Sequence, residues 1–276
     1  MRLIDVKHLG RERVIGCWEL DGVLIDPGPT SSMDNLIEAL GGQEPRALLL
    51  THIHLDHAGA AGSLVRRWPE LPVHVHERGA RHLADPAKLL ASAERLYGDQ
   101  MDRLWGEVLP VPEANLNVLG GGEEVLGFRV AYTPGHASHH VSYFHPPTGR
   151  AFVGDTAAVR IPPSDWVLPP TPPPDIDLDL WEESIDRILD WEPGSLGLTH
   201  FGEVDRPEAH LDLVRERLRE QGELAAKLSA EEFEARIREQ AAEEADPETT
   251  KAMLQAVPPE QQWLGLDRYW RTRGAS

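Results

Sequence analysis

Short apolar runs separated by turn residues fill the first 200 positions of the chain. Runs of this length, bounded by glycine, proline or aspartate, are typical of β-strands. They predict strands at 14–18, 22–26, 47–50, 73–76, 125–132, 141–144, 151–153 and 196–198.

Apolar residues at helical spacing lie between several of these strands and predict helices there. The predicted helix starts are Ser31 or Ser32, Ala58, Asp85-Pro86, and Asp177 or Asp179. The helix that starts at Asp85-Pro86 is expected to run unbroken to Leu104. Strands and helices in alternation indicate an α/β fold.

Two later segments do not show this alternation of strands and helices. Residues 161–174 contain seven prolines and so can form neither a helix interior nor a central strand. We expect a stiff surface loop there, and a candidate lid. After Asp205 only helical patterns follow, with a capping box at Ser229 and Glu232 and helix starts at Asp246-Pro247 and Pro258-Pro259. The predicted organisation is a domain over 1–205 and a C-terminal helical extension over 206–276.

Composition narrows the class of protein. The 276 residues are 41% hydrophobic and 26% charged, a balance that is typical of a soluble globular protein. A formal charge of −19 disfavours nucleic acid and anionic membranes as partners. The single Cys17 excludes an intramolecular disulfide, and no apolar stretch reaches the ~18 residues of a membrane span. Because the start also lacks the apolar segment of a signal peptide, we expect a cytoplasmic protein; a homo-oligomer stays open.

The stretch THIHLDH, at 51–57, places three histidines and an aspartate directly after an apolar run. Further histidines and an aspartate each follow a later predicted strand. Imidazole and carboxylate bind zinc, iron or manganese where thiolate is absent, and seven such groups suit two ions about 3.5–4 Å apart better than one tetrahedral ion. The candidate metal ligands are His52, His54, Asp56, His57, His136, Asp155 and His200.

These residues resemble the metallo-β-lactamase superfamily of metallohydrolases. The signature H-x-H-x-D-H is met at 52–57, the later ligands follow in the family's order, and the resemblance covers roughly residues 10–205. It implies an αββα sandwich with two divalent ions at one sheet edge, zinc first, with iron or manganese as alternatives. It also implies that a shared hydroxide attacks the substrate and that Asp56 orients it. The implied ligands are His52, His54 and His136 for the first ion, Asp56, His57 and His200 for the second, and Asp155 as the bridge.

Departures from particular branches restrict the function. Flavodiiron oxidoreductases carry glutamate at the position of His54, nucleases add a basic exosite or an inserted domain, and secreted β-lactamases carry a signal peptide. We find none of these features in this sequence, so these three branches are disfavoured. A hydrolase of a small-molecule ester, thioester or lactone remains, similar to the glyoxalase II and lactonase branches. The alternatives are an iron-dependent sulfur dioxygenase, against which His57 and His200 argue, a phosphodiesterase or nuclease, and a non-catalytic module that has kept the fold.

Other residues receive supporting or ordinary roles. We expect hydrogen bonds from Asp26, Thr51 and Thr133 to hold the ligand imidazoles, and His140 to lie beside the ligands without binding metal. Trp166 either lines the substrate pocket or packs on its own domain. We expect the following side chains to be solvated, or to pack in the core, without a role in the chemistry: His8, His74, His76, His82, His139, His145, His210, Arg268, Arg271 and Arg273.

Overall fold

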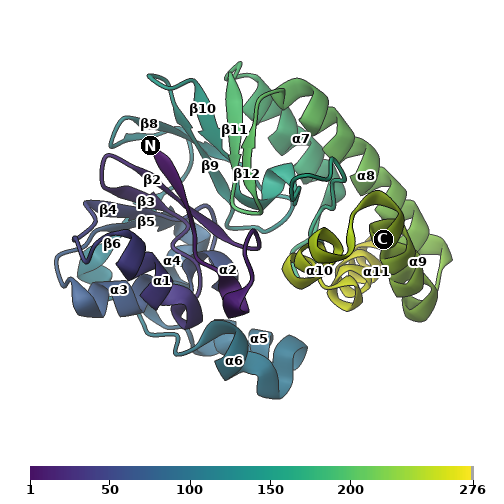
Figure 1. Ribbon diagram of the computed structural model, residues 1–276, viewed down its shortest axis with the longest axis horizontal. Helices are drawn as coiled ribbons and strands as arrows, with labels where there is room; N and C mark the ends of the chain where they lie inside the picture. Colours follow the sequence, from purple (N-terminus) through teal and green to yellow (C-terminus); the bar gives the residue numbers. More distant parts are fainter. Residues whose placement is uncertain (275–276) are drawn as a thin grey trace.

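A computed structural model describes residues 1–274 as two facing β-sheets with helices on their outer sides (Figure 1). The first sheet has six strands in sequence order: β1 (Arg2–Asp5), β2 (Gly16–Leu20), β3 (Val23–Ile25), β4 (Ala47–Leu49), β5 (Val73–His76) and β6 (Leu116–Leu119). Its first three strands pair antiparallel, and β3 to β6 pair parallel. The strand predicted at 14–18 is β2, which begins two residues later, at Gly16.

The second sheet is also six-stranded, with β12, β11, β10, β9, β8 and β7 in that spatial order. The bounds are β7 (Glu124–Val125), β8 (Phe128–Tyr132), β9 (Val141–His145), β10 (Arg150–Phe152), β11 (Ser195–Leu198) and β12 (Gly202–Val204). Only β10 and β11 pair in parallel. The α/β sandwich predicted from the sequence is confirmed.

Helices cover both outer faces. The first sheet is accompanied by α1 (Met33–Ala39), α2 (Leu55–Ala58), α3 (Ala61–Arg67), α4 (Glu77–Ala84), α5 (Ala87–Tyr97) and α6 (Met101–Trp105). The second is accompanied by α7 (Leu178–Leu189) and α8 (Pro207–Lys227), and the chain ends with α9 (Ala230–Glu244), α10 (Pro247–Ala256) and α11 (Pro259–Gly274). In Figure 1, α5 and α6 lie at the bottom of the view and α10 and α11 at its lower right. None of these helices combines the length and apolar character that a bilayer-spanning helix needs.

The core between the sheets consists of aromatic and branched side chains from alternate strand positions. Trp18 of β2, Phe128 of β8, Tyr143 of β9 and Phe152 of β10 are all buried in one cluster. The ring centroids of Trp18 and Phe152 lie 5.6 Å apart in an edge-to-face arrangement. Burying each ring contributes on the order of 2 kcal/mol, so this cluster holds the two sheets together.

Several sequence predictions of helices and strands were wrong at their boundaries. The helix expected to run to Leu104 is broken, because Gly98 adopts φ 52° and ψ −129°, outside the helical region. The strand at 125–132 is split by a turn in which Leu126 and Gly127 both have positive φ. Neither Ser31 nor Ser32 caps α1 with its side chain; the Ser31 hydroxyl instead donates to the Leu104 carbonyl at 2.6 Å.

The predicted caps of the later helices are confirmed. The Asp177 carboxylate accepts from the first backbone N–H groups of α7, and Asp246 does the same for α10. Ser229 and Glu232 form the expected capping box of α9. Caps of this kind are local in sequence, which is why the pattern alone could predict them.

The proline-rich segment 161–174 is not the surface loop that was predicted. Trp166 is 4% exposed and Thr171 is fully buried, because the C-terminal helices cover them. The Ser164 hydroxyl donates to the Glu244 carbonyl at 2.9 Å, and the Thr171 hydroxyl donates to the Gln262 carbonyl at 3.2 Å. Apolar residues of α8 to α11 belong to the same buried cluster as residues of the first sheet. The division at residue 205 remains a prediction.

Candidate metal centre

The seven predicted ligands come from four separate stretches of chain, each of which follows a strand. His52 and His54 lie in the extended segment after β4, and Asp56 and His57 lie in the short helix α2. The other three follow β8, β10 and β11, and they are His136, Asp155 and His200. The structure brings all seven together in two groups, and within each group the donor atoms lie within 4.8 Å of one another.

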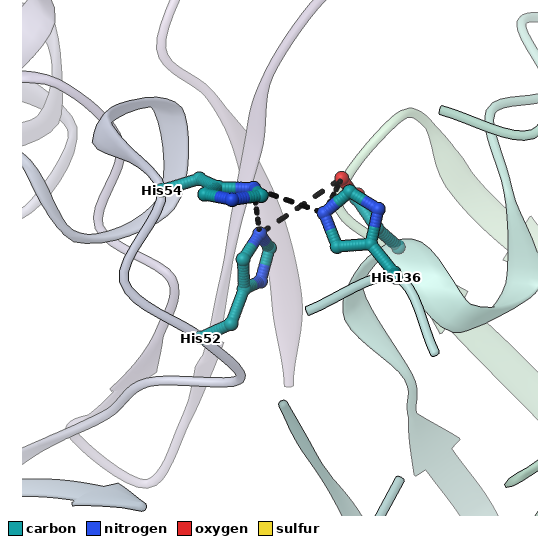
Figure 2. Close-up of side chains that lie close together, drawn as sticks. His52, His54 and His136 are labelled. Carbon is teal, nitrogen blue, oxygen red and sulfur yellow. Dashed lines mark hydrogen bonds and ion pairs between the residues drawn. The ribbon is translucent and has the colours of Figure 1, made fainter. Parts of the chain in front are cut away.

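The first group contains three imidazoles and one carboxylate. His54 Nδ1 lies 3.0 Å from His52 Nε2 and 2.9 Å from His136 Nε2. Asp155 Oδ2 lies 3.3 Å from His136 Nε2 and 3.9 Å from His52 Nε2. Figure 2 shows the rings of His52, His54 and His136 pointing toward a common point, the first two from one stretch of chain and the third from another.

The second group lies on the other side of the same aspartate. His200 Nε2 is 3.3 Å from both His57 Nε2 and Asp56 Oδ2. Asp155 Oδ1 is 3.3 Å from His57 Nε2 and 3.7 Å from His200 Nε2. The two oxygens of Asp155 therefore face different groups, as the resemblance implied for a bridging residue.

Hydrogen bonds on the far side of the rings fix which nitrogen carries the proton. His136 Nδ1 bonds the Pro170 carbonyl at 2.8 Å, and His200 Nδ1 bonds the Val14 carbonyl at 2.6 Å. His57 Nδ1 bonds the Asp26 carboxylate at 2.8 Å. Carbonyl and carboxylate oxygens can only accept, so Nδ1 is the donor in all three rings. In the neutral ring Nε2 then keeps its lone pair, and it is Nε2 that faces the centre.

Asp26 connects the two groups. Its Oδ1 accepts from the Thr51 backbone N–H at 2.8 Å, and its Oδ2 accepts from the Thr51 hydroxyl at 2.7 Å and from the Thr199 hydroxyl at 3.0 Å. With its proton on Asp26, the Thr51 oxygen accepts from His52 Nδ1 at 3.1 Å. Asp26 thus orients His57 directly and His52 through Thr51. The predicted supporting roles of Asp26 and Thr51 are confirmed.

Thr133 and His140 form a separate layer. The Thr133 hydroxyl lies 2.9 Å from His140 Nδ1, and the His140 ring stacks on the His52 ring with centroids 5.1 Å apart. Thr133 therefore supports His140, and not a ligand as was predicted. Gly154, at φ +45°, makes room for this layer, because a Cβ there would lie 2.5 Å from Thr51 Oγ1 and 2.6 Å from His140 Nε2.

The donor set fits divalent cations. Asp155 Oδ1 is buried and forms no hydrogen bond within residues 1–274. A buried carboxylate oxygen without a partner is costly, and a cation between it and the facing imidazoles would satisfy it. Burial lowers the pKa of His54 to about 4 and holds the pKa of His52 well below its ordinary value, so both rings are neutral near pH 7. Neutral imidazole is the form that binds metal.

The second group has a different electrostatic balance. Burial would lower the pKa of His57, but the neighbouring Asp155 and Asp56 outweigh it and raise that pKa. Burial would also raise the pKa of Asp155, but the imidazoles of His57 and His136 hold it well below its ordinary value. The carboxylates of Asp56 and Asp155 therefore give this group negative surroundings, which favour a positive charge between them and the facing imidazoles.

A cavity of about 960 Å³ opens beside the centre. His54, Asp56, His136, Asp155 and His200 reach it from one side. Its other walls come from α4 to α6, from the prolines at 170 and 172–174, and from α10 and α11. The C-terminal helices therefore contribute to the pocket, a role that no local pattern in residues 206–276 indicated.

Several histidines lie elsewhere than their sequence context suggested. His8 and His139 were expected to have no role near the chemistry, yet both line the cavity, and His8 stacks on Trp105 with ring centroids 5.6 Å apart. Burial lowers the pKa of His8 to about 4. His76 stacks on Tyr132 outside the cavity, and Trp166 packs in the core.

Comparison with known proteins identifies the family. The family model described as the metallo-beta-lactamase superfamily matches residues 19–193. The metallo-beta-lactamase fold-containing protein ST1585 of Sulfurisphaera tokodaii is 31% identical over 197 residues, which cover 68% of this chain and 71% of that protein. The chain belongs to the metallo-beta-lactamase superfamily, which confirms the resemblance read from residues 52–200.

Other relatives are more distant or shorter matches. A hydroxyacylglutathione hydrolase of Legionella pneumophila is 29% identical over 140 residues, so the match spans 50% of this chain and 44% of that enzyme. The crystal structure of ST1585 from Sulfolobus tokodaii has a TM-score of 0.66 at 26% identity and covers 92% of this chain and 93% of its own. TTHA1623 in a di-iron-bound form has a TM-score of 0.52 at 26% identity, covering 72% and 91%.

Proposed function

We propose that this metal-dependent hydrolase binds two divalent metal ions through the seven clustered side chains and cleaves a small-molecule ester, thioester or lactone. The observation that carries the proposal is the position of Asp155, whose two buried oxygens face two separate groups of donor atoms. One ion would need only one of these groups. Zinc is the first candidate, because it readily takes imidazole and carboxylate ligands, and the di-iron form of TTHA1623 makes iron the second.

Two bound cations supply a water of lowered pKa and polarise the substrate oxygen. The chain's own contribution is orientation. Asp56 has a side-chain exposure of 21%, against 5% for Asp155, so it is the more accessible of the two carboxylates of the centre that line the cavity. We assign Asp56 to orient the attacking water and accept its hydrogen bond. Pro170, Val14 and Asp26 hold three imidazoles so that their lone pairs stay directed at the centre.

The cavity supports a small-molecule substrate. Its volume of about 960 Å³ is within the range of sites that enclose compact organic ligands. The formal charge of −19 works against a nucleic acid. The Legionella relative is named a hydroxyacylglutathione hydrolase, although the match spans less than half of that enzyme. Ester, thioester and lactone share an acyl carbon that hydroxide attacks, which is why one centre can serve all three.

The test is a substrate panel with matched variants. Protein loaded with zinc, iron or manganese is assayed on a thioester, a lactone, a phosphodiester and a cephalosporin, and the metal bound per chain is measured. We expect about two ions per chain and hydrolysis of an acyl substrate, reduced to background in His54→Ala and Asp56→Asn. His145→Ala, which changes a histidine of β9 outside the cavity, is the control and should keep full activity.

Three outcomes would contradict the proposal. One is full activity in His54→Ala or Asp56→Asn. Another is cleavage of the phosphodiester alone, which would assign the chain to the phosphodiesterase alternative. The third is one iron per chain with oxygen consumption on a persulfide, which would assign it to the sulfur dioxygenases.

A further inference from the structure

We propose that the substrate of this site carries an anionic group remote from the acyl carbon, and that arginine and lysine side chains of α4 and α5 bind that group across the cavity from the metal centre. The proposal rests on the proposed hydrolase function and adds the chemical class of the substrate's far end. Carboxylate and phosphate share the required chemistry, and the experiment below distinguishes them.

Two helices direct cations at the cavity. Arg78 and Arg81 are three residues apart on α4, and Lys88 and Arg95 are seven residues apart on α5, so each pair lies on one face of its helix. All four side chains line the cavity. Ser92, between Lys88 and Arg95 on the same face, adds a hydroxyl that can donate to an anion.

These four cations have no carboxylate partner in the described chain. Among residues 1–274, 16 of the 27 lysine and arginine side chains lie within 4.0 Å of a carboxylate oxygen. None of the four in the cavity wall does. Arg78 lies over the Tyr132 ring at 5.7 Å, and Arg81 Nε is 3.2 Å from His82 Nε2. In a chain with 46 acidic residues, leaving every cation of one wall unpaired keeps them available for a ligand.

The acidic groups of the cavity do not neutralise the positive charge of this cationic wall, which consists of Arg78, Arg81, Lys88 and Arg95. Asp56 and Asp155 belong to the metal centre, which leaves Glu77 and Asp175. Asp175 already accepts from the Ser138 backbone N–H at 3.3 Å and from the Ser138 hydroxyl. The wall therefore has an excess of positive charge, whereas the chain as a whole repels anions.

The C-terminal arginines, by contrast, are occupied elsewhere. Arg268 donates to the Pro174 carbonyl at 3.0 Å, Arg271 pairs with Asp267 at 3.0 Å, and Arg273 pairs with Asp179. None of the three lines the cavity. Anion binding in this chain is thus assigned to α4 and α5.

Apolar side chains of α5, α6 and the segment after His54 also form part of the cavity wall. Leu55, directly after His54, packs with Ala93 of α5 and Trp105 of α6 in one buried cluster. Leu89 and Leu104 pack against the same cluster and also line the cavity. The cavity therefore matches an amphipathic substrate, with its acyl carbon at the metals, an apolar middle, and an anionic end at α4 and α5.

The first experiment uses matched substrates and variants. Thioesters with the same acyl group and an apolar chain end in a carboxylate, a phosphate or a neutral amide. We expect the metal-loaded protein to prefer an anionic end in kcat/KM, by a factor that shrinks as salt is added. Each of Arg81→Gln, Lys88→Gln and Arg95→Gln should raise KM for the anionic substrates by about two- to fivefold and leave the amide unchanged. Arg129→Gln, an exposed and unpaired cation of β8 outside the cavity, is the control.

A second readout does not need metal or turnover. Anilinonaphthalene sulfonate, an amphipathic anion, is titrated into metal-free protein and followed by fluorescence, with neutral phenylnaphthylamine in parallel. The combined Lys88→Gln and Arg95→Gln variant should weaken binding of the anion by about fourfold or more and leave the neutral probe unaffected.

The outcomes separate the two proposals. If no acyl substrate is cleaved by the loaded protein, the proposed function fails, while the probe titration still tests the cationic wall. If the amide is cleaved as well as the anionic substrates and the variants bind both probes like the wild type, the cationic wall is refuted and the hydrolase stands. A preference for carboxylate over phosphate, or the reverse, names the anion.

Discussion

Replacing Asp26 by asparagine should disable both metal positions although Asp26 touches neither. The carboxylate is fully buried and accepts four hydrogen bonds, from the Thr51 backbone N–H, from the hydroxyls of Thr51 and Thr199, and from His57 Nδ1. Asp26 has φ 54°, a conformation that asparagine also tolerates, so the exchange adds no backbone strain. What changes is that one acceptor oxygen becomes an NH₂ donor.

The change reverses the hydrogen-bond direction around Oδ2. An NH₂ group at that place faces His57 Nδ1, which must give up its proton to accept, and the proton moves to Nε2, the atom that points at the centre. The Thr51 hydroxyl, no longer donating to position 26, donates to His52 Nδ1 with the same result for that ring. Loss of such an orienting partner typically weakens metal affinity by about 10–100-fold, which is roughly 1.4–2.8 kcal/mol.

The assay is metal titration of purified protein, with stoichiometry measured at a free metal concentration that half-saturates the wild type. We expect Asp26→Asn to bind well under half as much metal and to lose activity in proportion. Thr199→Val removes one donor to Oδ2 but leaves His57 and Thr51 in place, so it should bind metal normally and lose only about 1 kcal/mol of stability. Wild-type metal affinity in Asp26→Asn would show that the tautomers of His52 and His57 are not set by this carboxylate.

Three further predictions concern the stability of the fold. Burial lowers the pKa of His210 to about 4, so the unfolded chain binds this proton more tightly than the folded one. The free energy of unfolding should therefore fall by about 3 kcal/mol from this group as the pH drops from about 6.5 to 4. His210→Gln, which can still donate to the Ala157 carbonyl, should show a shallower decline in urea unfolding across that range, and equal slopes would contradict the assignment. Gly135 has φ +133°, and a Cβ added there would lie 2.5 Å from Trp181 Cβ, so Gly135→Ala should cost more than about 2 kcal/mol of stability and weaken metal binding at the adjacent His136. Gly122→Ala, at a position that also has positive φ but open space around it, should cost less. Equal thermal shifts in the two variants would rule out the clash. Removing metal with a chelator should lower the unfolding midpoint, by an amount near 2.7 kcal/mol for metal at a hundredfold its Kd, and re-adding zinc should restore it; an unchanged midpoint would mean that the native state binds no metal.

Local sequence was sufficient to predict the fold class and which side chains cluster in the structure. The histidines and aspartates that cluster in the structure each follow an apolar run, and the spacing within 52–57 brings alternate residues to one side. The caps at Asp177, Ser229 and Asp246 were also readable, because a cap and its partner lie within three residues of each other. Wherever an interaction is local, the residue pattern contains both of its partners.

Contacts between distant residues were decided only by the tertiary structure. The burial of the proline-rich segment depends on Gln262, and the tautomer of His200 depends on Val14, 186 residues away. The cationic wall depends on α4, a helix that the sequence pattern did not indicate. Each of these features needs segments that approach one another only in the folded chain, and the pattern of one segment contains no information about its partner. The residues of the cluster are therefore encoded locally, whereas their orientation and the shape of the cavity arise from packing.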